Sequence, residues 1–238
     1  MKPVVAPVKN VSATQIAFST LFQRALGVPG MALVHGPSGF GKTTTTTYLY
    51  NQVNGIYVSA RAHDTTSSLT SRIVEELGAQ PKHRISKNVD YIIEQMSMYE
   101  RPLFIDEADY LMNDTRMLDT IRDLYDGTET PVILIGMDQI ARRISAHKQF
   151  YNRISEWVEF KPADLEDVQI MADYLLEEGI KAEPELLDHL RQSTNGEMRR
   201  ITIGLTKIEA LALANDLDLI TLDDWGDQPF HGLRSLAG

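Results

Sequence analysis

The sequence feature that most constrains the fold is a glycine-rich stretch, GPSGFGKT, at residues 36–43. It matches the pattern G-x-x-x-x-G-K-[ST] at every fixed position, with a short apolar run before it and a helical segment after it. Glycines let the backbone curl so that its N–H groups face phosphate oxygens, and the positive end of the following helix adds to the attraction. The stretch therefore predicts a strand–loop–helix unit that binds phosphate groups.

Two side chains of this loop have expected roles. Lys42 is placed to reach the terminal phosphates of a nucleotide, and the Thr43 hydroxyl is placed to ligate magnesium. The threonines at 44–47 are expected to pack in the helix, with hydroxyls bonded back to the preceding turn. The predicted nucleotide-binding set of the loop is Gly36, Pro37, Ser38, Gly39, Phe40, Gly41, Lys42, Thr43 and Thr44.

A pair of acids follows a second apolar run. The stretch PLFIDEAD is typical of a buried strand that ends in Asp106 and Glu107. One carboxylate suits water-mediated magnesium binding, and the adjacent one suits polarisation of an attacking water. The pair therefore favours hydrolysis of a nucleoside triphosphate over transfer of phosphate to a small acceptor.

Short apolar strands alternate with helical patterns up to about residue 160, which predicts an α/β fold with a five-stranded parallel sheet covered on both faces. A lead-in helix precedes the sheet, with Ser12 and Gln15 in capping-box spacing. Three helical patterns follow Pro162, at 164–178, 184–193 and 197–214. The expected organisation is a lead-in helix at 1–27, a core at 28–162, a small helical lid at 163–215 and a tail at 216–238, whose last ten or so residues we expect to be mobile.

The composition excludes some kinds of chemistry and indicates the kind of DNA contact and the compartment to expect. There are no cysteines, so thiol catalysis, disulfides and cysteine-ligated zinc are excluded. The formal charge of −10 is opposite to that of a protein that coats nucleic acid with its whole surface, so any DNA contact must be a local patch. No apolar run has the length of a signal peptide or a membrane span, and we expect the cytoplasm.

Arginines near the end of the predicted core are candidates to stabilise charge on a transferring phosphate, often one held by a neighbouring subunit. Arg153 precedes the last strand and is the best candidate, with Arg142 and Arg143 on the helix before it as alternatives. Arg199 and Arg200 begin the third lid helix, where one of them would reach back over the triphosphate. The competing interpretation is that these arginines are solvated charges or members of surface ion pairs.

These features together resemble the AAA+ ATPases. The resemblance rests on the 36–43 loop, the Asp106–Glu107 pair, an arginine before the fifth strand and the spacing Gly196-x-x-Arg199. More narrowly, the chain resembles the target-selecting transposon ATPases, the family of transposition protein B of phage Mu. The narrower resemblance rests on GIYVSARAHDTTSSLTSRIVEELG, IDEADYL and VILIGMDQI.

The resemblance implies an AAA+ P-loop core with three layers, a helical lid, and ATP with Mg²⁺ bound between neighbouring subunits. It also implies helical filaments on double-stranded DNA with little sequence preference, and delivery of that DNA to a transposase, without a membrane. By position, it assigns Asp106 to magnesium and Glu107 to the catalytic water. It assigns Arg153 to the neighbour's phosphate and Arg199 to sensing of nucleotide by the lid.

This sequence departs from the pattern of its relatives at two points. Many relatives carry a polar residue at the end of the fourth strand to sense the terminal phosphate, where this chain has Met137 followed by Asp138. The phage Mu protein also has an additional N-terminal DNA-binding domain, whereas only a short lead-in stands here. DNA contact is therefore expected from the ATPase core itself.

A basic stretch of the core is the candidate DNA surface, although ordinary solvated loop charges remain the alternative. The candidate residues are Arg61, Ser67, Lys82, His83, Arg84 and Lys87.

Two other functions of the chain stay open. A replication-type loader that passes a helicase onto DNA shares the same core, and a secretion or envelope ATPase would show no ATP-dependent affinity for DNA.

Overall fold

The computed structural model describes residues 1–230, so most of the tail end that the sequence predicts to be mobile lies outside the described residues. The chain forms two compact units. The sheet unit consists of Ala13–Pro37 and Lys42–Phe160. Among the described residues, the helical unit consists of Met1–Ser12, Ser38–Gly41 and residues 161–230.

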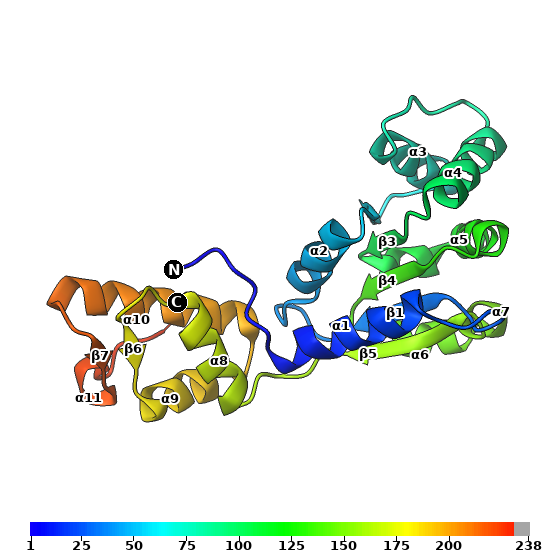
Figure 1. The fold of residues 1–238 in the computed structure, drawn as a ribbon. Coiled ribbons are helices and arrows are strands. Elements are labelled where there is room, and N and C mark those ends of the chain that lie inside the picture. Colours follow the sequence, from blue (N-terminus) through cyan, green and yellow to red (C-terminus); the bar gives the residue numbers. More distant parts are fainter. Residues whose placement is uncertain (231–238) are drawn as a thin grey trace, which may run out of the picture. The chain divides into compact units, whose positions relative to one another are not determined.

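A five-stranded parallel sheet in the order β2-β3-β4-β1-β5 forms the centre of the sheet unit (Figure 1). The strands are β1 Met31–His35, β2 Ile56–Ser59, β3 Leu103–Asp106, β4 Val132–Gly136 and β5 Ile154–Glu159. His35 is in register with Gly136, and Ser59 with Asp106. The carboxyl ends of the strands therefore meet at one edge, which holds the glycine loop and the acid pair.

Helices cover both faces of this sheet, as the sequence predicts. Alternate strand residues such as Leu33, Ile105 and Leu134 pack against α3, α4 and α5, which Figure 1 shows together beside the sheet. On the other face, the Phe104 ring lies 5.8 Å from Phe18 of α1 and 6.0 Å from Tyr50 of α2. The helices are α1 Lys9–Phe22, α2 Lys42–Gln52, α3 Thr66–Glu76, α4 Ile85–Tyr99, the 3₁₀ helix η1 Ala108–Asn113, α5 Thr115–Thr128, α6 Ile140–Ser145 and α7 Lys148–Tyr151.

The predicted capping box at Ser12 is wrong, because α1 begins at Lys9 and Ser12 lies inside its first turns. The reason is a contact that is distant in sequence. The Asp167 carboxylate accepts a hydrogen bond from the Lys9 N–H at 2.8 Å and so satisfies a free donor at the helix start. Ser12 instead donates its hydroxyl to the Pro7 carbonyl at 3.3 Å.

The helical unit contains the three predicted helices and three short elements that the sequence pattern does not predict. Its buried core includes Val8 and Val11 from the N-terminal segment and Trp225 and Phe230 from the predicted tail, the last two with rings stacked at 4.5 Å. The structure thus groups both ends of the described chain with the lid helices, unlike the division at 27, 162 and 215. The elements are α8 Leu165–Leu175, β6 Lys181–Ala182, α9 Pro184–Thr194, α10 Met198–Asn215, β7 Leu219–Ile220, paired with β6, and α11 Leu222–Trp225.

Within residues 1–230, no helix combines the length and the apolar character needed to cross a bilayer.

Candidate nucleotide-binding site

The loop between β1 and α2 has a backbone that requires glycine. Gly36, Gly39 and Gly41 have φ values of +148°, +83° and +90°, in the region that side chains disfavour. A Cβ on Gly36 would also lie 2.7 Å from the Phe160 carbonyl oxygen. Because α2 begins at Lys42, its first N–H groups have no intrahelical acceptor and are available to an anion.

The Lys42 ammonium spans the loop. Its Nζ donates to the Gly36 carbonyl at 2.7 Å and to the Pro37 carbonyl at 2.8 Å. Burial lowers the pKa of Lys42, and the nearby carboxylates of Asp106 and Glu107 partly oppose this. A phosphate oxygen is a stronger acceptor for an ammonium than a carbonyl oxygen, so this geometry fits a bound phosphate.

The acid pair lies beside the start of α2. The Thr43 hydroxyl donates to Asp106 Oδ2 at 2.8 Å, so the structure brings together the two predicted magnesium-binding residues. Glu107 is exposed, and its backbone has a φ of +52°, an uncommon conformation for a residue with a side chain. Its N–H donates to Asp106 Oδ1 at 2.8 Å, which fixes the acid pair internally. The loop glycines, the ammonium and this hydroxyl–carboxylate pair fit a nucleotide with Mg²⁺.

Sequence reasoning missed two residues near this site, of which Tyr57 contacts it directly. The Tyr57 hydroxyl of β2 donates to Asp106 Oδ2 at 2.5 Å, and burial together with this hydrogen bond raises the pKa of Tyr57. Asp109 accepts a hydrogen bond from the Met137 N–H at 2.7 Å, so a carboxylate anchors the end of β4, where Met137 stands. The only signal for Tyr57 was its place in a strand next to the acid strand.

The middle of the threonine run packs as the sequence predicts. Thr45 and Thr46 are buried. The Thr46 hydroxyl donates to the Lys42 carbonyl at 3.0 Å and lies 3.2 Å from the Thr43 carbonyl oxygen, which confirms the bond back to the preceding turn. Thr44 is exposed beside the loop.

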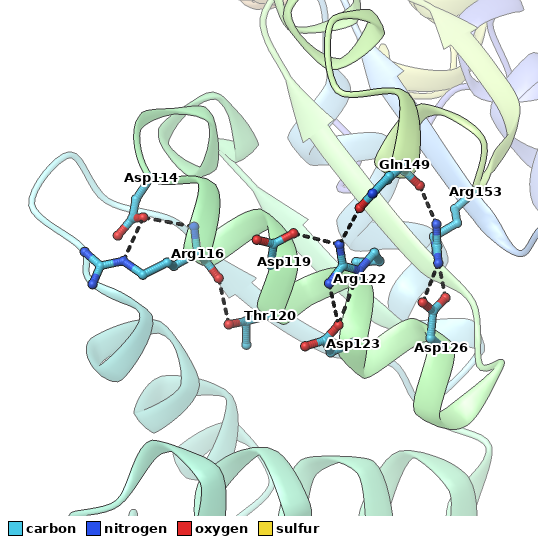
Figure 2. Close-up of polar contacts among 9 residues, drawn as sticks. All are labelled: Asp114, Arg116, Asp119, Thr120, Arg122, Asp123, Asp126, Gln149 and Arg153. Atoms are coloured by element: carbon cyan, nitrogen blue, oxygen red, sulfur yellow. Dashed lines mark hydrogen bonds and ion pairs between the residues drawn. The ribbon is translucent and has the colours of Figure 1, made fainter.

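Arg153 is held by its own chain (Figure 2). Its Nε and Nη2 donate to Asp126 Oδ1 and Oδ2 at 2.6 and 2.5 Å, and its Nη1 donates to the Gln149 carbonyl. Together with residues 24–29, the pair lines an open pocket of about 740 Å³, so the guanidinium can be reached from outside. The hydrogen bond with Asp126 raises the pKa of Arg153, which stays charged.

The position of Arg153 separates it from the loop of its own chain. Arg153 precedes β5, and its carbonyl accepts a hydrogen bond from the N–H of Met31, the first residue of β1. The glycine loop follows the other end of β1, a strand of five residues. From Met31 to Gly36, the first residue of the loop, five steps of about 3.3 Å give a separation of about 16 Å.

The alternatives to Arg153 lie on α6. Arg143 donates to the Asp109 carbonyl and to Asn113 Oδ1, each at 3.2 Å, so it is tied to η1. Arg142 is exposed.

Arg199 stands at the start of α10 in the helical unit, to which Ser38–Gly41 also belong. Its N–H donates to the Gly39 carbonyl at 2.9 Å, and its side chain is exposed. The surface ion pair considered for these arginines involves Arg200, which contacts Glu197 at 2.8 Å.

The six candidate DNA-binding residues are exposed, but they form two groups at opposite ends of α3. Arg61 and Ser67 lie at its amino end, and the other four follow its carboxyl end. A helix of 11 residues is about 16 Å long. Each group has a fixed backbone. Asp64 accepts from the Arg61 N–H at 2.7 Å, and Asn88 accepts from the Lys82 N–H at 2.7 Å.

Comparison with known proteins connects this geometry to a family. The family described as an AAA domain matches residues 26–144, which is half of the chain and contains both the loop and the acid pair. The chain belongs to the AAA domain family. No match to the sequence of a curated protein was found.

Solved structures confirm the fold of this AAA domain protein. ORC2 of Aeropyrum pernix, solved as ADPNP–ADP complexes, has a TM-score of 0.69 at 16% identity, over 94% of this chain and 68% of that chain. ORC1 of the same organism, solved in complex with DNA, has a TM-score of 0.63 at 15% identity, over 94% and 64%. Cdc6p of Pyrobaculum aerophilum has a TM-score of 0.65 at 16% identity, over 94% and 68%. The predicted AAA+ P-loop fold with a five-stranded parallel sheet is correct.

Proposed function

We propose that this AAA domain protein binds ATP with Mg²⁺ at the 36–44 loop and hydrolyses it. The observation that supports this most is the 2.8 Å hydrogen bond from the Thr43 hydroxyl to Asp106. The residue before Thr43 is Lys42, whose ammonium donates to the Gly36 carbonyl of the loop. In this proposal Lys42 binds the terminal phosphates, Thr43 ligates the metal and Asp106 holds it through water. Mg²⁺ held there would neutralise charge on the phosphates. Glu107 orients and polarises the attacking water.

We propose that hydrolysis needs a neighbouring copy of the chain. Arg153 lies about 16 Å from the loop of its own chain, estimated from the strand rise, but it borders an open pocket. Its guanidinium is therefore suited to a phosphate that a neighbour holds, in the manner of an arginine finger. Arg199, whose backbone contacts the loop at Gly39, is the proposed sensor of nucleotide in the lid.

The proposed ligand of the assembled protein is double-stranded DNA. The exposed cations at Lys82, Arg84 and Lys87, with Arg61 at the other end of α3, suit phosphates spaced along a duplex. Contacts to phosphate carry no base information, so little sequence preference is expected. The net charge of −10 confines DNA to such a patch.

We propose more narrowly that the chain assembles as a filament on target DNA and activates a transposase. The support is the resemblance to target-selecting transposon ATPases over residues 55–78, 105–111 and 132–140. A second candidate is a replication-type loader, which the fold similarity to ORC and Cdc6 proteins favours. A secretion or envelope ATPase predicts no ATP-dependent affinity for DNA.

The test of DNA binding is a fluorescence anisotropy titration of random-sequence duplex with a non-hydrolysable ATP analogue. Lys82→Glu with Arg84→Glu should weaken binding at least tenfold and lower the slope of log K against log salt by about two. Lys148→Glu with Lys161→Glu is the matched control, with the same charge change at exposed sites elsewhere. Equal effects of both pairs would reject the basic patch, and binding without nucleotide would reject ATP dependence.

A further inference from the structure

Asp106 is surrounded by more donors than the loop alone supplies. It is 7% exposed, and it accepts hydrogen bonds from the Thr43 hydroxyl, the Tyr57 hydroxyl and the Glu107 N–H at 2.8, 2.5 and 2.8 Å. The first two bonds go to Oδ2 and the third goes to Oδ1. An ionised carboxylate offers about four acceptor positions, two on each oxygen. One position, on Oδ1, is therefore left for a further donor.

Tyr57 is itself held firmly in place. Its strand is paired with the strand that ends in Asp106, and its ring lies 5.1 Å from the ring of Tyr50 on α2. The pairing of the two strands and the Tyr50 ring therefore fix the phenol beside Asp106.

We infer that Tyr57 is a positioning residue for the magnesium site. Its hydroxyl occupies the second acceptor position of Oδ2 and fixes the Asp106 carboxylate, so that Oδ1 presents a single acceptor position to a metal-bound water. Thr43 keeps its hydroxyl hydrogen on Oδ2, which leaves its oxygen lone pairs for the metal. This inference rests on the proposed binding of ATP with Mg²⁺.

The loss of Tyr57 is expected to affect the metal more than the nucleotide. Without the phenol, Oδ2 has an empty acceptor position and the carboxylate can rotate away from Thr43. Partners that orient metal-binding groups typically contribute tenfold or more to metal affinity. In the proposed site Lys42 and the loop glycines hold the phosphates. The Lys42 ammonium bonds to loop carbonyls whereas the Tyr57 hydroxyl bonds to Asp106, so nucleotide affinity without metal should stay unchanged.

The test compares Tyr57→Phe with the wild type and with Tyr50→Phe, which removes the same hydroxyl from the adjacent ring. Affinity for a fluorescent ATP analogue is measured with Mg²⁺ and in EDTA, and Mn²⁺ binding to the complex is followed by electron paramagnetic resonance. Tyr57→Phe should weaken metal binding about tenfold and leave affinity in EDTA unchanged. Tyr50→Phe should match the wild type in both.

A double-mutant cycle tests whether Tyr57 acts through Asp106. In an Asp106→Ala background, Tyr57→Phe should weaken metal binding no further. Wild-type metal affinity in Tyr57→Phe, or an equal loss with Mg²⁺ and in EDTA, would overturn the inference while leaving the proposed function standing. A wild-type protein that binds no nucleotide would instead overturn the proposed function, and this inference with it.

Discussion

The ion pair between Asp126 and Arg153 yields a quantitative prediction, because it holds the proposed arginine finger on its own chain (Figure 2). The pair is side-on, with N···O distances of 2.6 and 2.5 Å, and the two side chains are 40% and 27% exposed. Exposed pairs contribute about 0.2–1 kcal/mol, and the side-on geometry places this one near the upper value, about 1 kcal/mol. That free energy corresponds to about a fivefold change in an equilibrium constant.

Asp126→Asn keeps the shape of the side chain and removes its charge. Because Arg153 must leave Asp126 to reach a neighbour's phosphate, we expect the protein concentration at half-maximal ATP hydrolysis to fall about fivefold. The same change removes a native contact, so the melting temperature should fall by about 2–4 °C. A gain of activity with a loss of stability is the expected signature.

The assay is steady-state ATP hydrolysis against protein concentration, with DNA present at saturation. Asp123→Asn is the matched control, because Asp123 lies on the same helix and pairs with Arg122 at 2.9 Å. It should leave the concentration dependence unchanged. The reasoning is refuted if Asp126→Asn loses activity as Arg153→Ala does, since Asp126 would then position the finger, or if the concentration dependence does not change.

Three further predictions concern single side chains. Gly36→Ala should weaken nucleotide binding at least tenfold, since its Cβ would lie 2.7 Å from the Phe160 carbonyl oxygen at a φ of +148°; thermal melting with and without an ATP analogue checks this, and an unchanged nucleotide-induced shift would contradict it. Glu107→Gln should keep nucleotide binding and slow single-turnover hydrolysis by about 10²–10⁴, whereas a near-normal rate would assign the water to another group. The hydrogen bond from Lys9 lowers the pKa of Asp164, the residue that caps α8. Ionised Asp164 therefore stabilises the folded protein at pH values above the pKa of Asp in the unfolded chain, about 3.9. This stabilisation is lost as the pH falls through the lower pKa of Asp164 in the folded protein. Urea denaturation followed by circular dichroism should therefore show a smaller loss of stability between pH 5 and pH 3 in Asp164→Asn than in the wild type, and equal losses would rule out this linkage.

The sequence predicts the glycine loop, the acid pair and the five strands because each is encoded over a few consecutive residues. The fixed glycines need particular φ values, and buried parallel strands produce apolar runs wherever they lie in the chain. The contact between Thr43 and Asp106 follows from this pattern, because the carboxyl ends of parallel strands meet at one edge of the sheet. Their 2.8 Å separation agrees with that expectation.

The rest depends on contacts between residues far apart in the sequence. Asp167 sets the start of α1 through a bond to Lys9, 158 residues away. Tyr57 reaches Asp106 from the neighbouring strand, and neither partner carries a local signal of the pair. The two-residue strands β6 and β7 are too short for any periodic pattern, so the sequence predicts only a tail after residue 215.

Electron microscopy of the protein with random-sequence duplex DNA tests the central claim, ATP-dependent assembly on DNA, most directly. Samples with a non-hydrolysable ATP analogue, without nucleotide and with Lys42→Ala are compared. The account predicts filaments on DNA only for the wild type with the analogue. Closed rings, particles indifferent to DNA, or filaments that persist in Lys42→Ala would contradict it.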